Sequence, residues 1–142
     1  MKEIEWTDDL SVGVGLIDEQ HKMLIKRLND LKLSLTEQQG PAQIASTMNF
    51  LVEYTDFHFS TEEKHMEANE YPTFEAHKKM HDGFKQTLSG LEEDFEEEGA
   101  TQGLADSIDT LLVNWLINHI QKVDVEFGKF LMSKGIELPE EG

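Results

Sequence analysis

Apolar side chains recur at alternating steps of three and four residues along four long parts of this sequence. This spacing keeps one face of an α-helix apolar, and no part of the chain shows the strict alternation of a half-buried strand. The four parts are separated by residues that end and begin helices, at Gly40-Pro41, at Tyr71-Pro72 and at 99–103. The pattern therefore predicts an all-α protein.

The predicted helices cover about 18–38, 41–68, 73–97 and 104–133. Asp18 is the predicted N-cap of the first helix, and residues 1–17 form an N-terminal arm before it. Short connections between long helices favour antiparallel neighbours. We therefore expect residues 1–142 to form one domain, an up-down-up-down antiparallel four-helix bundle with an N-terminal arm.

The apolar seams of these helices are interrupted by polar residues. The most regular seam, in the third helix, runs through Phe74, His77, His81, Phe84, Leu88, Leu91 and Phe95. The other three seams contain His21, His58, Glu62 and His119, and Asp124 lies just over one turn beyond the last of these. These groups lie near the start, end, start and end of successive helices, so an antiparallel bundle brings all of them toward one end of the core.

A buried carboxylate or imidazole is costly without a partner, and a divalent metal would satisfy both. Two ions bridged by the carboxylates of Glu62 and Asp124 and by one solvent oxygen would use all seven groups and leave one coordination position free. Imidazole with carboxylate suits iron, although manganese, zinc and cobalt are also compatible with the spacing. His119 and Asp124 are five residues apart, which a regular helix does not place on one face, so we predict a local widening of the helix or side chains that reach inward from two flanks.

Composition excludes several other classes. The chain has no cysteine, which rules out thiolate metal sites and cysteine nucleophiles. Its formal charge of -17 repels phosphate backbones and anionic lipids, so nucleic acid and membrane surfaces are poor partners. We find neither a signal peptide nor an apolar stretch long enough to cross a membrane, and we expect a cytoplasmic monomer.

The sequence resembles the hemerythrins, in particular the single-domain bacterial ones, through "IDEQHKML", "HFSTEEKHM", "YPTFEAHKKMHDGF" and "NWLINHIQKVDVEF". The resemblance implies a non-haem di-iron centre in which two ions are bridged by Glu62, Asp124 and an oxo or hydroxo group. It assigns His77, His81 and His119 to one iron. It assigns His21 and His58 to the other, where dioxygen would bind.

A dry pocket should protect the oxygenated state, and five residues placed near the ligands are its candidates: Leu24, Phe59, Trp115, Leu116 and Ile120. The leading hypothesis is reversible dioxygen binding for storage, delivery or buffering, with an oxygen-consuming protein as the possible recipient. The alternatives are oxygen or redox sensing through a separate partner, and a di-iron peroxidase or oxidase. His65, which the motif does not use, is interpreted as a surface or bundle-end residue.

Overall fold

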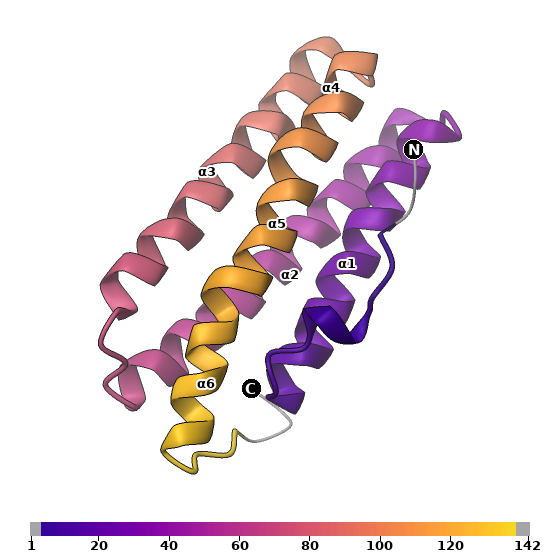
Figure 1. Cartoon of the computed structure of the whole chain (residues 1–142). Helices are drawn as coiled ribbons and strands as arrows, with labels where there is room; N and C mark the ends of the chain where they lie inside the picture. The colour runs from indigo at the N-terminus through magenta and orange to yellow at the C-terminus, as the bar shows by residue number, and fades with distance from the viewer. Residues whose placement is uncertain (1–3, 139–142) are drawn as a thin grey trace.

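The computed structural model describes residues 4–138, and the ends of the predicted arm and tail, 1–3 and 139–142, lie outside this range. Four long helices lie side by side with alternating direction, so the predicted antiparallel bundle is confirmed (Figure 1). No strand occurs among the described residues. The bundle consists of α1 (Gly15–Thr36), α2 (Pro41–Ala68), α3 (Phe74–Glu98) and a fourth long helix.

The fourth long helix contains two segments with a wider hydrogen-bond pattern, and it runs through them without a break. It is built from α4 (Gln102–Ser107), η2 (Ile108–Val113), α5 (Asn114–His119), η3 (Ile120–Asp124) and α6 (Val125–Ser133). The η2 and η3 segments are π-helices, in which each backbone hydrogen bond spans one residue more than in an α-helix. The helix begins where the Thr101 hydroxyl accepts a hydrogen bond from the Leu104 N–H at 3.0 Å.

The prediction that Asp18 caps the first helix is wrong. The helix begins at Gly15, with Val14 as its N-cap residue, and Asp18 lies inside its first turn. The Asp18 carboxylate instead accepts hydrogen bonds from the Ser11 hydroxyl at 2.5 Å and the Val12 N–H at 2.8 Å. An aspartate before an apolar helix can thus bind the preceding arm as well as cap the helix, and the sequence pattern is the same in both cases.

The N-terminal arm runs back along α1 and contains one short 3-10 helix, η1 (Asp8–Leu10) (Figure 1). At its outer end, the backbone of Ile4 is paired with the Asn29 side chain through two hydrogen bonds, of 2.9 and 2.8 Å. Nearer to α1, the side chains of Leu10, Val12 and Val14 are buried in the main core. The arm is therefore part of the bundle's core packing.

The arm passes very close to α6 at Gly128. A Cβ atom placed on Gly128 would lie 2.1 Å from the carbonyl oxygen of Val12, which is well inside the distance at which such atoms repel. Only a glycine at this position lets the arm's backbone lie against the helix. Gly128 is itself buried, so the contact is sealed from water.

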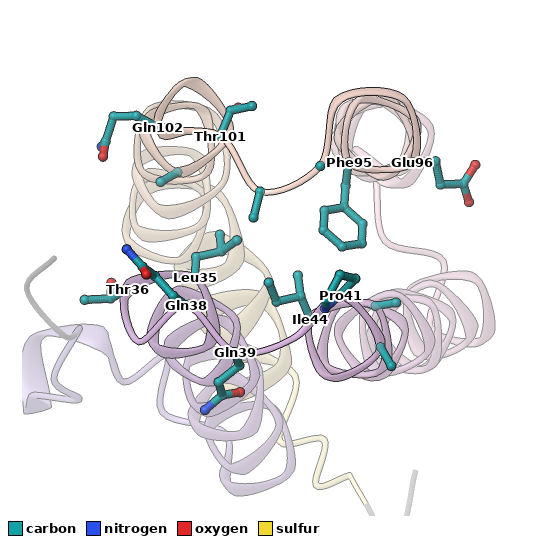
Figure 2. A pocket seen from close by; sticks show the side chains of 15 residues that line it. Leu35, Thr36, Gln38, Gln39, Pro41, Ile44, Phe95, Glu96, Thr101 and Gln102 are labelled. Carbon is teal, nitrogen blue, oxygen red and sulfur yellow. The ribbon is translucent and has the colours of Figure 1, made fainter.

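The two ends of the bundle differ in character. At one end, a cleft of about 1060 Å³ lies among the ends of α1 and α3 and the beginnings of α2 and α4. Figure 2 shows Leu35, Ile44 and Phe95 directed into this cleft. The buried histidines, together with Glu62 and Asp124, lie toward the opposite end. Among the described residues, no helix has an apolar stretch of the length needed to span a bilayer.

Candidate metal centre

The polar residues predicted from the four seams converge in the structure. Their ligand atoms form two groups, in each of which all atoms lie within 4.8 Å of one another. The larger group is Glu62, His77, His81, His119 and Asp124, and the smaller is His21, His58, Glu62 and Asp124. Both carboxylates belong to both groups. Every member is at most 4% exposed, so the cluster is closed to bulk water.

Each helix contributes through its own periodicity. On α2 and α3, the pairs His58 with Glu62 and His77 with His81 are four residues apart and share a face. Asp124 is the last residue of the π-helical segment Ile120–Asp124, which follows directly after His119. Because a π-helix places residues five apart nearly one above the other, the predicted local widening of the helix is confirmed.

Asp124 is surrounded by three histidines from three different helices. Its Oδ1 lies 2.9 Å from His77 Nε2 and 3.1 Å from His119 Nε2, and its Oδ2 lies 2.9 Å from His21 Nε2. The two nitrogens of His77 and His119 are themselves only 3.1 Å apart. The carboxylate thus has one oxygen toward each of the two groups, as a bridging ligand requires.

Glu62 has a similar place on the other side of the cluster. Its Oε1 lies 3.3 Å from His58 Nε2 and 3.3 Å from His81 Nε2, and these two histidines belong to different groups. Its side chain is fully buried. It therefore connects the two groups from α2 as Asp124 does from the fourth helix.

The hydrogen bonding of these atoms tests whether a metal would fit. Several buried atoms make no hydrogen bond although an oppositely polar atom lies within 3.3 Å of them: Nε2 of His21, His58 and His81, Oε1 of Glu62 and Oδ1 of Asp124. The second carboxylate oxygen of Glu62 is also without a partner. A buried polar atom without a partner destabilises the fold, because its lost hydration is not replaced. Their lone pairs converge without pairing, which is the arrangement that cations would satisfy, so these residues fit a metal centre.

Both carboxylates are held in the ionised form. Burial and the neighbouring Asp124 carboxylate raise the pKa of Glu62, but His58 and His81 outweigh them and keep this pKa below its ordinary value. Burial likewise raises the pKa of Asp124, and the surrounding histidines, His119 first, lower it well below the ordinary value. Two negative charges are thus fixed in a buried site, and they attract positive ions.

The histidines respond unequally to the same surroundings. Burial lowers the pKa of His58, and the attraction of the carboxylates does not compensate. For His81, the effect of burial is outweighed by the nearby carboxylates of Glu62 and Glu63, which raise its pKa to about 9. Burial is also outweighed at His21, whose pKa is raised by Asp124. Protons on these rings would have to leave before a metal could bind.

Two aromatic side chains cover histidine rings of the cluster. Phe59 is stacked on His81, with ring centroids 3.9 Å apart and planes inclined by 3°, and Trp115 is stacked on His119 at 4.3 Å and 12°. The other three candidates for the oxygen pocket, Leu24, Leu116 and Ile120, are at most 3% exposed and belong to the same core. Their role in a pocket stays a prediction.

Two residues that were not predicted from the sequence accept hydrogen bonds from histidines of the cluster, at the Nδ1 atoms that face away from the centre. His58 Nδ1 donates to the Gln20 side-chain oxygen at 2.7 Å, and His81 Nδ1 donates to the Glu63 carboxylate at 2.9 Å. Gln20 precedes His21 and Glu63 follows Glu62, so both lie beside the seams and not on them. The only signal in the sequence is that each neighbours a predicted ligand.

Of the two alternatives expected for His65, surface or bundle end, the structure bears out the bundle end. The residue lies in the last turn of α2, at the end of the bundle, but its side chain is only 8% exposed and is not on the surface. Its Nε2 has no hydrogen-bond partner. It belongs to neither of the two ligand groups formed by the described residues.

Comparison with known proteins gives a consistent result over nearly the whole chain. The sequence model of the Hemerythrin HHE cation binding domain matches residues 12–131. The chain is 36% identical to the bacteriohemerythrin of Stenotrophomonas maltophilia over 87% of its length and 78% of that protein, and 31% identical to the myohemerythrin of Theromyzon tessulatum over 87% and 89%. It superposes on a crystal structure of wild-type hemerythrin with a TM-score of 0.79 at 29% identity, covering 90% of this chain and 97% of the other. The chain belongs to the hemerythrin family.

Proposed function

We propose that this protein binds dioxygen reversibly at a di-iron centre, for storage, delivery or buffering of oxygen. The observation that carries the proposal is the convergence of five buried imidazoles and two shared carboxylates from four helices. Membership of the hemerythrin family, whose bacterial and animal relatives cover most of the chain, supports the same function.

The two ligand groups suggest how the ions would be held. His77, His81 and His119 would bind one iron and His21 and His58 the other, while Glu62 and Asp124 would bridge them together with a solvent-derived oxygen. This division follows the two groups of ligand atoms, which share only the carboxylates. An iron pair held in this way would supply an open coordination position and electrons to dioxygen, and would recover the electrons when dioxygen leaves.

The protein's own residues favour reversible binding over oxygen activation. Di-iron enzymes with a ferritin-like fold use about four carboxylates and two histidines, whereas this cluster has two carboxylates and five histidines. Fewer anionic ligands stabilise high iron oxidation states less. Phe59 and Trp115, which cover two of the histidine rings, would also keep water and protons away from the centre.

The test is to load the protein with ferrous iron without oxygen, count the metal per chain, and record the visible spectrum before oxygen, in oxygen and after purging. We expect two irons per chain and an absorption band that appears with oxygen and disappears on purging. One iron per chain would contradict the proposed centre. An irreversible change with peroxide release would instead indicate an oxidase.

A further inference from the structure

Two histidines of the cluster donate hydrogen bonds from Nδ1, and the acceptors differ in charge between the two ligand groups. Gln20, on α1, accepts from His58 on α2, and Glu63, on α2, accepts from His81 on α3. His58 belongs to the group with two histidines and His81 to the group with three. In the group with two histidines the acceptor is therefore a neutral amide, and in the group with three it is a carboxylate.

These are specific contacts within the protein. The Gln20 side chain is 5% exposed and that of Glu63 is 16% exposed, so bulk water screens neither bond fully. By contrast, the Nδ1 atoms of His21 and His77 are buried without any partner. Among these four rings, one in each ligand group donates a hydrogen bond from Nδ1. One acceptor is a neutral amide and the other is a carboxylate.

The charge of the acceptor changes how strongly the ring binds a metal. A carboxylate that accepts from Nδ1–H draws the proton toward itself and increases the electron density at Nε2, the atom that faces the centre. An amide oxygen fixes the same tautomer and ring orientation with a weaker effect, because hydrogen bonds to ionised groups are about twice as strong as neutral ones. Both residues orient a ring, but only Glu63 adds negative charge.

We propose that Glu63 and Gln20 are positioning residues that make the two ions unequal, with the higher electron density on the ion held by His81. This inference rests on the proposed di-iron centre. Greater electron density on that ion stabilises its ferric state, so the carboxylate lowers the reduction potential of the centre and strengthens oxygen binding. The amide behind His58 leaves the other ion poorer in electrons.

The test uses changes that keep each hydrogen bond and alter only its charge. In Glu63→Gln, we expect the full two irons per chain, a higher reduction potential for the diferric to diferrous couple in a reductant titration, and oxygen affinity about tenfold lower. In Gln20→Glu, we expect the opposite shift of the potential. The matched control is Glu67→Gln, which removes the same charge from an exposed residue one turn further along α2.

A second readout does not depend on iron or oxygen. In protein loaded with zinc and labelled with ¹⁵N-histidine, Glu63→Gln should move the Nδ1 resonance of His81, and Gln20→Glu that of His58, each with little change at the other ring. The Nε2 resonance of the same ring should move as well, whereas a role that only orients the ring would leave the Nε2 resonance unchanged.

The inference is overturned if Glu63→Gln shifts the potential no more than Glu67→Gln does, or if both charge changes shift it in the same direction. Failure of reversible oxygenation, by contrast, would contradict the proposed function and leave the potential and resonance measurements to decide this inference separately.

Discussion

Replacement of Phe59 by alanine should affect both the stability of the bundle and the chemistry of its centre. The Phe59 ring is 1% exposed, is stacked on His81 at 3.9 Å, and also contacts Phe84 and Trp115. A buried phenylalanine removes roughly 200 Å² from water. At about 25 cal/mol per Å² this contributes about 5 kcal/mol, and large-to-small changes in cores lose about 3–5 kcal/mol.

Phe127 provides the matched control. Its ring is 0% exposed, and its ring contact, at 5.0 Å, is with Tyr71 and not with a histidine of the cluster. Phe127→Ala should therefore lose a similar free energy of unfolding, about 3–5 kcal/mol. Only Phe59→Ala uncovers a face of His81 and opens space for water beside the centre.

The assay is urea unfolding of the iron-loaded variants, followed by their rates of irreversible oxidation in air, measured by the visible spectrum. We expect comparable losses of stability and a much faster oxidation only for Phe59→Ala. Phe59→Leu and Phe127→Leu make the same comparison if the alanine variants do not fold. Equal oxidation rates in the two variants would refute the reasoning that the aromatic cover protects the centre.

Three further outcomes are expected. Glu62→Ala should sharply lower the iron content by metal analysis because it removes a proposed bridging ligand, whereas His65→Ala should leave it nearly unchanged; equal losses would show that the ligand assignment is wrong. Gly128→Ala should cost about 1–3 kcal/mol in urea unfolding, because its Cβ would lie 2.1 Å from a backbone carbonyl oxygen of the arm, whereas Gly83→Ala, with nothing within 4 Å, should stabilise α3 by up to about 1 kcal/mol. The pKa of His81 is raised from its ordinary value of 6.5 to about 9. Its proton therefore stabilises the metal-free fold in full below pH 6.5, and this contribution is lost as the pH rises through about 9. Metal must displace that proton, so metal affinity should increase from pH 7 to 9 in calorimetric titrations, and a flat profile would argue against it.

The sequence predicted the bundle and its ligand cluster because both follow from helical periodicity. A residue such as His77 has to face the core if its neighbours on the seam do, and four seams meet in one place once the helices alternate in direction. The widened turn before Asp124 could also be predicted, since the five-residue spacing from His119 does not fit a regular helix.

Other features left no periodic signal. The wide turn Ile108–Val113 contains no pair of ligands whose spacing would reveal it. Asp18 has the same neighbours in the sequence whether it caps a helix or binds an arm, and only the path of the arm decides between them. Gln20 and Glu63 act through contacts across helices, which depend on how the helices are rotated against one another.

The π-helical segment Ile120–Asp124 has a consequence for how this chain can change its length. The segment accommodates a surplus residue, and the exposed side chains of Gln121 and Lys122 lie on its outer side. Deletion of Lys122 would tighten the turn and bring the histidine and aspartate to a spacing of four, again on one face, so iron content should survive it. Deletion of one residue between His58 and Glu62 would rotate every later residue of α2 about the helix axis by about 100°. The loss of one residue is therefore tolerable at this turn, whereas it would disrupt the ligand spacing in the regular helix α2.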